Sequence, residues 1–353
     1  MEHFLKNITI QTFKSIQHLE IKDCNKINLF IGPPNVGKSN ILEALSLFDV
    51  VDVFHNKENQ QLYRDIKGDV FIPHTLDRII RIENLPDLFY LGDISKYSVV
   101  STNQYVCQSK ISDNILQVSI SGASGNNFSS TSVFSKDLKF KFGSVSVPYS
   151  TCMPKLYKFS LKTKDENYEV GSFDVLNSPF GENITEVIQY NSVVKKEIFD
   201  FLKFQGVNLI FDTTEHKIRI ILMHTDNVFF TIPYSSIADT LQRIIFYKTA
   251  VKSNKYSILL FEEPEANCYP PYIKALTQDI VESNTNQFFI ATHSDIVVNH
   301  FLENAFNDTM IYMVDFLDGQ TVVQSLTEQQ KLDIVTEGID IFFNRDYFLT
   351  TTN

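Results

Sequence analysis

The spacing of hydrophobic residues predicts a strand–loop–helix unit near the N-terminus of this chain. Ile8–Phe13 and His18–Lys22 alternate in polarity, so we expect two short strands around a turn. Lys26–Ile31 follows as a mostly apolar run that is typical of a buried strand. Gly32–Ser39 then contains two glycines and two prolines, and Asn40–Phe48 carries apolar residues at helical spacing, which predicts a helix after a tight loop.

The middle of the chain favours strands. From Ser98 to Leu161 the polarity mostly alternates with a period of two, which predicts a β-rich region. Ser121–Ser132 consists largely of small and polar residues, so we expect a loop there. Residues 184–204 predict a helix, and two further strands are expected near Asn208–Asp212 and Lys217–Met223.

The C-terminal third predicts a parallel sheet. Ser257–Phe261 and Gln287–Thr292 are apolar strands separated by the helical pattern of Tyr272–Val281, and Met310–Val314 continues the alternation. We therefore expect an α/β protein: a mixed N-terminal β lobe, a parallel sheet flanked by helices, and a β-rich or α+β insertion. The expected domains are a core formed by residues 1–50 and 230–353 and an insertion of residues 51–229. The sequence contains no long heptad array, so we expect no coiled-coil arms.

Composition and charge narrow the classes of protein that fit. The chain has 353 residues, enough for two domains or one domain with an insertion, and 43% hydrophobic residues. A net charge of -11 disfavours a surface built for nucleic acid, although a local basic stripe near Lys195, Lys196 and Lys203 stays open. The four cysteines are far apart in sequence, which indicates reduced thiols. Without a signal peptide or membrane-length apolar run, we expect a soluble cytoplasmic protein.

Gly32–Ser39 fits the phosphate-binding pattern G-x-x-x-x-G-K-[ST] at every fixed position. Backbone N–H groups that open a helix point at phosphate oxygens, and the helix dipole favours the negative charge. Lys38 is expected to reach the β and γ phosphates of ATP, and the Ser39 hydroxyl to ligate Mg²⁺. The alternative is a chance glycine turn. The expected nucleotide contacts are Gly32, Pro33, Asn35, Val36, Gly37, Lys38, Ser39 and Asn40.

Two adjacent carboxylates, Glu262 and Glu263, stand at the carboxyl end of a predicted buried strand, where α/β sheets place ligands. Hydrolysis of a nucleoside triphosphate needs a metal and an oriented water. We expect Glu262 to hold Mg²⁺, directly or through water, and Glu263 to polarise the attacking water. An exposed acidic turn is the alternative, and the ordered motifs that follow argue against it.

Three short motifs resemble the SMC/RecF/OLD branch of ABC-type P-loop ATPases, including the groups called AAA_15 and AAA_21. They are Phe13–Ile16, Leu260–Ala266 and Ala291–Ser294. The resemblance implies an ABC-type ATPase head in which Lys14 approaches the phosphates and His293 senses the γ-phosphate. The family usually continues with E-A-H, where this chain has Glu265-Ala266-Asn267, so the residue that faces a partner subunit differs.

ABC-type heads close on ATP as head-to-tail dimers, and the resemblance implies the same homo-oligomer here. The candidate signature is Pro233–Phe246, a helix start capped by serine in which Ser235 or Ser236 would donate to the γ-phosphate of the other subunit. It lacks both glycines of the usual signature, and an ordinary N-cap is the alternative. Gln104, Gln108 and Gln117 are candidates for the glutamine loop, and the pattern does not choose among them.

The resemblance also implies a function class. The motifs look most like ATPase subunits of bacterial anti-phage systems such as the PARIS ATPase, in which nucleotide-dependent assembly controls an effector. Only sixty residues follow His293, too few for a nuclease domain, so a toxin or nuclease partner in trans is expected. A DNA-binding clamp of the recombination and repair type is the alternative, and a transporter ATPase subunit is a third interpretation.

Overall fold

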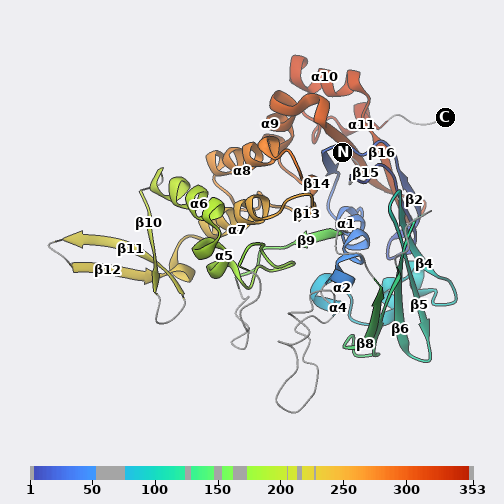
Figure 1. Ribbon diagram of the computed structural model, residues 1–353. Helices are drawn as coiled ribbons and strands as arrows, with labels where there is room; N and C mark the ends of the chain where they lie inside the picture. The colour runs from blue at the N-terminus through green and yellow to red at the C-terminus, as the bar shows by residue number, and fades with distance from the viewer. Residues whose placement is uncertain are drawn as a thin grey trace, which may run out of the picture. The chain divides into compact units, whose positions relative to one another are not determined.

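The computed structural model describes residues 4–52, 76–123, 129–146, 153–161, 173–204, 206–212, 217–225 and 228–349 (Figure 1). The chain divides into two compact units. The first comprises residues 1–156, 256–263 and 287–353, and the second comprises residues 157–255 and 264–286. The two units divide the chain at other residues than the expected domains do. The domain boundaries near residues 50 and 230 therefore stay a prediction.

The first unit contains two sheets. One is antiparallel with seven strands in the order β2-β1-β4-β5-β6-β7-β8, and the other has six strands in the order β16-β15-β3-β14-β13-β9. The antiparallel strands are β1 (Ile8–Phe13), β2 (Ile16–Ile21), β4 (Ser98–Thr102), β5 (Tyr105–Ser112), β6 (Ile115–Gly122), β7 (Ser129–Phe134) and β8 (Phe140–Ser146). The six-stranded sheet comprises β3 (Ile27–Ile31), β9 (Pro154–Tyr157), β13 (Ile258–Glu262), β14 (Gln287–Ala291), β15 (Thr309–Leu317) and β16 (Gln320–Ser325).

Parallel pairing in the second sheet gathers several chain segments at one edge. Strand β14 pairs in parallel with both β13 and β3, and β15 pairs in parallel with the other side of β3. In this register Ala291 lies opposite Glu262 on one side and Phe30 on the other. The residues that follow β3, β13 and β14 therefore all leave the sheet at its carboxyl edge, as expected for a ligand-binding α/β sheet.

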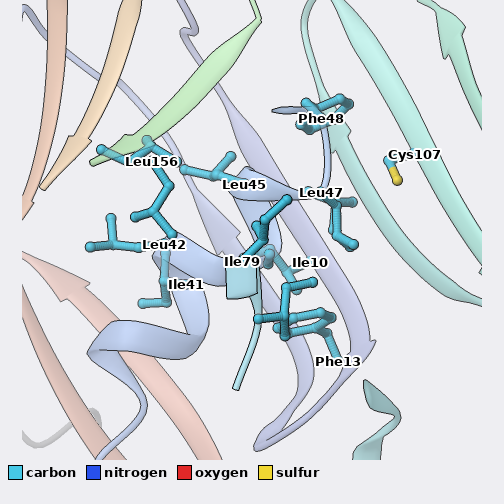
Figure 2. Close-up of a cluster of buried hydrophobic side chains, with 14 of the residues drawn as sticks. Ile10, Phe13, Ile41, Leu42, Leu45, Leu47, Phe48, Ile79, Cys107 and Leu156 are labelled. Carbon is cyan, nitrogen blue, oxygen red and sulfur yellow. The ribbon is translucent and has the colours of Figure 1, made fainter. Parts of the chain in front are cut away.

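Helix α1 (Lys38–Ser46) packs between the two sheets, where it contacts β1, β13 and β14. Figure 2 shows its apolar side chains beside Ile10 and Phe13 of β1, with Cys107 of β5 and Leu156 of β9 at the borders of the same cluster. Because α1 is covered on both sides, every residue from Ile41 to Ser46 is buried. The remaining helices of this unit are α2 (Asp49–Asp52), α4 (Leu76–Ile79), α9 (Asp295–Ala305), α10 (Glu328–Glu337) and α11 (Arg345–Phe348).

The second unit combines helices with a small antiparallel sheet of order β10-β11-β12. Its elements are α5 (Ile184–Tyr190), α6 (Ser192–Phe204), α7 (Asp239–Ser253), α8 (Pro270–Glu282), β10 (Asn208–Asp212), β11 (Lys217–Thr225) and β12 (Val228–Pro233). Its core joins Val187 of α5 and Ile198 of α6 with Leu209 of β10 and Ile245 of α7.

Two sequence predictions are corrected by the structure. Residues 184–204 form two helices, because Asn191 ends α5 and its side-chain oxygen accepts from the backbone N–H groups of Val193 and Val194 at 3.1 and 3.2 Å, which starts α6. Ser129–Ser132, expected in a loop, belongs to β7, where Ser130 and Ser132 are buried and pair with β6 and β8. Small polar side chains can be buried in a strand of this sheet, so the polarity of the segment wrongly predicted a loop.

The expected fold class is confirmed in its architecture. The fold is mixed α/β with a β-rich lobe, and α7, with 15 residues, is the longest helix in the described ranges, so these contain no coiled-coil arm. None of the helices in the described part of the chain combines the length and hydrophobicity needed to cross a bilayer.

Candidate functional site

The phosphate loop connects β3 to α1 through a backbone that glycine makes possible. Gly37 precedes the first residue of α1 with a φ of 103°, and a Cβ atom there would lie 2.1 Å from the Thr321 hydroxyl oxygen. At the other end, a Cβ on Gly32 would lie 2.1 Å from the carbonyl oxygen of Val314 in β15. Gly37 is therefore required by its backbone conformation and by the Thr321 side chain, and Gly32 by the close approach of the β15 backbone.

Lys38 is the buried cation of this loop. Its ammonium donates to the carbonyl oxygens of Gly32 at 2.8 Å and Pro33 at 2.7 Å, so the side chain curls back over the loop. Burial lowers the pKa of Lys38 to about 8, against the opposing charges of Glu263 and Glu262. The Lys38 ammonium is thus held against the loop backbone, within electrostatic reach of Glu262 and Glu263.

A chain of hydroxyl groups braces the back of the loop. The Thr321 hydroxyl donates to the carbonyl oxygen of Val36 at 2.8 Å, so the Ser15 hydroxyl must donate to Thr321 over their 2.6 Å separation. Ser15 in turn accepts from the side-chain amide of Asn40 at 2.6 Å. The Asn40 amide is therefore directed at Ser15, and its predicted contact with nucleotide would use its backbone. Neither Ser15 nor Thr321 was singled out from the sequence.

The acidic pair and the histidine meet at the carboxyl edge of the sheet. Glu262 ends β13, and the backbone N–H of Glu263, which has a φ of 44°, donates to the carbonyl oxygen of Ala291 at 2.9 Å. The Nε2 atom of His293 lies 3.5 Å from a carboxylate oxygen of Glu263. Burial and the charge of Lys38 lower the pKa of His293, against the opposing charge of Glu263, which favours the neutral imidazole near pH 7.

Ser294 explains why His293 is held at the start of a helix. The Ser294 hydroxyl caps α9 by accepting from the backbone N–H of Val297 at 3.4 Å, and its own N–H donates to the Thr292 hydroxyl at 3.1 Å. The histidine is thereby fixed between a buried strand and a capped helix, with its ring half-exposed at the sheet edge.

Arg81 and Glu43, two charged residues that the sequence analysis missed, form a group of ion pairs with Glu262. Arg81 donates to Glu43 at 2.7 Å and to Glu262 at 3.0 Å, and Lys14 forms an ion pair with the other oxygen of Glu43. Lys14 is thus engaged with helix α1, and its predicted approach to nucleotide phosphates remains a prediction. A signal for Glu43 was present, because it is an acidic residue inside the apolar pattern of Asn40–Phe48.

The signature candidate belongs to the second unit, and its predicted serine cap is wrong. Helix α7 begins at Asp239 after Ala238, with no side-chain cap, whereas Ser235 and Ser236 lie in the preceding 3-10 turn, Tyr234–Ser236. The Gln242 side chain closes this turn by donating to the carbonyl oxygen of Ile237 at 2.9 Å. Both serines are exposed, so their hydroxyl groups face solvent rather than the helix they were expected to cap.

The glutamine-loop candidates lie on the antiparallel sheet. Gln108 and Gln117 are exposed positions of β5 and β6, and Gln104 lies in the turn between β4 and β5, where its amide donates to the carbonyl oxygen of Phe4 at 3.3 Å. The geometry gives no reason to prefer one of them.

The donor chemistry of this edge fits Mg²⁺ that is shared with phosphate. Within the described ranges, no group of three or more His, Cys, Asp or Glu side chains could hold a metal on its own. Magnesium usually needs only one or two protein oxygen ligands, because phosphates and water complete its shell. Ser39, at the start of α1, and Glu262 supply hard oxygen donors of this kind.

A family model and two curated relatives match parts of the chain. Residues 156–299 match the family described as "AAA domain, putative AbiEii toxin, Type IV TA system". An ATP/GTP phosphatase of Helicobacter pylori is 27% identical over 116 residues, which are 30% of this chain and 31% of that protein. The DNA replication and repair protein RecF of Leptospira biflexa is 33% identical over 69 residues, 20% of this chain and 19% of RecF. The matches thus span less than a third of either relative.

The comparison with solved structures concerns the fold. An SMC head, solved bound to the C-winged helix domain of ScpA, superposes with a TM-score of 0.51 and 13% identity over 94% of this chain and 100% of that one. The chain therefore has the fold of an SMC head domain.

Proposed function

We propose that the protein binds and hydrolyses ATP. The observation that carries this proposal is the position of Lys38. It lies in a complete phosphate loop, and the charges of Glu262 and Glu263 at the end of β13 act on its ammonium group. A loop of this kind binds triphosphates, and paired carboxylates at the adjacent strand end supply the metal ligand and the water-orienting group.

Each residue of the site has a proposed role. Lys38 and the backbone N–H groups of the loop bind the β and γ phosphates, while Ser39 and Glu262 would hold Mg²⁺, which would neutralise charge that develops on the phosphates. Glu263 orients the attacking water. His293, kept neutral near pH 7, donates a hydrogen bond to the γ-phosphate and registers its release.

Binding and hydrolysis measurements on two variants test this assignment. Lys38→Ala is expected to lose ATP binding, and Glu263→Gln to keep binding while its turnover falls at least about a hundredfold, the range typical of a lost catalytic base. Lys22→Ala is a matched control, since Lys22 is an exposed lysine that pairs with Glu20 at 3.1 Å. Unchanged ATP affinity in Lys38→Ala, or full turnover in Glu263→Gln, would refute the proposal.

The assembly proposal adds ATP-dependent head-to-tail dimers that control an effector. Its support is the SMC-head fold, the exposed serines before α7, and a matching family whose description names a toxin–antitoxin system. We place the effector, a toxin or nuclease of the anti-phage type, in a separate protein in the cytoplasm. Free thiols at Cys24, Cys107 and Cys268 suit that reducing compartment, while Cys152 lies outside the described residues.

A DNA-binding clamp is the second candidate function, and the similarity to RecF favours it. The two candidates differ in their response to nucleic acid. If the protein is a clamp, duplex DNA should raise the ATPase rate and the effect should fade with added salt. A rate that ignores DNA, together with co-purification of the product of a neighbouring gene, favours the effector-controlling role.

A further inference from the structure

Arg81 is held in place more firmly than its half-exposed side chain suggests. Its Nε atom donates to a Glu43 oxygen at 2.7 Å, and its backbone N–H approaches the same oxygen at 3.4 Å. Its backbone carbonyl oxygen accepts from the Lys14 ammonium at 2.8 Å. These three attachments fix the guanidinium so that its Nη2 atom lies 3.0 Å from Glu262.

The four side chains form an alternating row of charges: Lys14, Glu43, Arg81 and Glu262. The Glu43 side chain is only 2% exposed, so its carboxylate needs both neighbouring cations to offset its burial. Arg81 cannot swing away without leaving that buried carboxylate half paired. Burial would lower the pKa of Arg81, but Glu43 and Glu262 together raise it, so the guanidinium stays charged at every working pH.

We propose that Arg81 makes the capture of a divalent cation at Glu262 conditional on bound nucleotide. A fixed positive charge beside the only carboxylate assigned to the metal repels a second cation and occupies one of the carboxylate oxygens. A bound triphosphate would restore a favourable electrostatic balance, because it would add negative charge to the metal site. This inference rests on the proposed function and deepens it by assigning a gate to its metal site.

The gate predicts that removing Arg81 uncouples metal binding from nucleotide binding. We would titrate Mn²⁺, observed by electron paramagnetic resonance, into the full chain with and without a non-hydrolysable ATP analogue. Without nucleotide, Arg81→Gln should bind Mn²⁺ on the order of tenfold more tightly than the wild type, as the Coulomb repulsion of one neighbouring charge allows. Arg81→Lys, which keeps the charge, should stay close to the wild type.

Two further variants make the test specific. In the double variant Arg81→Gln, Glu262→Gln, the gain in Mn²⁺ affinity should vanish, because Arg81 acts on the metal through Glu262. Arg219→Gln is a matched control, since it removes an equal charge from an arginine in the second unit that bonds the Thr231 hydroxyl at 3.0 Å. Thermal unfolding of each variant confirms that it is folded.

The outcomes separate failure of the gate from failure of the proposed function. Equal Mn²⁺ affinity of wild type and Arg81→Gln without nucleotide overturns the gate, as does a gain that persists in the Glu262→Gln background. If the wild type binds no ATP analogue at all, the proposed function fails instead, whatever the metal titrations give.

Discussion

The phosphate loop depends on residues far from it in sequence. Thr321 of β16 is completely buried, and its hydroxyl bonds a loop carbonyl that is 285 positions away, while Ser15 completes the brace from the turn between β1 and β2. A buried hydroxyl in this position stabilises a particular shape of the loop, because an unpaired carbonyl there would cost free energy. The affinity for ATP should therefore depend on the Thr321 side chain, even though Thr321 supports the loop rather than binding the nucleotide.

Thr321→Val removes the hydroxyl and keeps the shape of the side chain, whereas Thr321→Ser keeps the hydroxyl. We expect Thr321→Val to raise the Kd for ATP several-fold, equivalent to about 1 kcal/mol for one lost hydrogen bond, with little change in the turnover of bound ATP. Thr321→Ser should retain most of the wild-type affinity. Equal affinities of the two variants for ATP, measured by calorimetry, would show that the hydroxyl does not support the loop.

The lowered pKa of Lys38 predicts the pH dependence of ATP binding. Below a pKa of about 8 the ammonium is charged and attracts phosphate, and above it the neutral amine does not. The affinity of the free protein for ATP should therefore be level near pH 7 and fall above pH 8, by at most about tenfold per pH unit for a single group. An affinity that stays constant up to pH 9.5 would contradict this assignment.

At the residue scale, the sequence could predict the features that short motifs carry. The phosphate loop, Glu262, Glu263 and His293 were proposed from such motifs, and the structure brings them to one sheet edge, while their roles stay predictions. Arg81 and Thr321 could not be found this way, since their partners are set by the pairing of distant strands and by the packing of α1 rather than by neighbours in the chain.

At the scale of elements, the local hydrophobic pattern predicted whether a segment is a helix or a strand better than it predicted where the element begins and ends. The apolar runs at 257–261 and 287–292 became adjacent parallel strands, because continuous hydrophobicity is what a doubly covered sheet requires. The break at Asn191 and the serine-rich strand β7 were missed. In both cases a polar side chain has a structural role that polarity alone does not reveal, since Asn191 caps a helix and the serines of β7 are buried in a sheet.

A buried ion pair joins the two helices on either side of the β13 segment. Lys248 of α7 and Asp279 of α8 are 5% and 7% exposed, and Lys252 also reaches Asp279 at 3.0 Å. Both helices lie in the second unit, which also contains the signature candidate before α7. The pair therefore fixes how α7 packs on α8.

Breaking that pair should destabilise the protein strongly. We expect Asp279→Ala to lower the free energy of unfolding by about 3–5 kcal/mol, because it strands a buried ammonium, and Lys248→Met combined with Asp279→Leu to recover most of that loss. Chemical denaturation measures both. The exposed Lys22–Glu20 pair serves as a control, where Lys22→Ala should cost less than about 1 kcal/mol. A small effect of Asp279→Ala would mean that water or other groups already compensate Lys248.

At the scale of the whole molecule, the chain interleaves its two units. It leaves the first unit after residue 156, returns for residues 256–263, and leaves again until residue 287. The predicted catalytic carboxylate Glu263 is thus the last residue of the first unit before the chain enters the second. The backbone that carries Glu263 therefore continues directly into the unit that carries Ser235 and Ser236.

The most direct test of this account is the mass of the particle, by light scattering, for wild type and Glu263→Gln with and without ATP and Mg²⁺. We predict that Glu263→Gln traps ATP and doubles in mass only when both are present, and that adding Lys38→Ala to the same chain abolishes the shift. A mass that is identical with and without nucleotide, in a variant that demonstrably holds ATP, would contradict ATP-driven assembly.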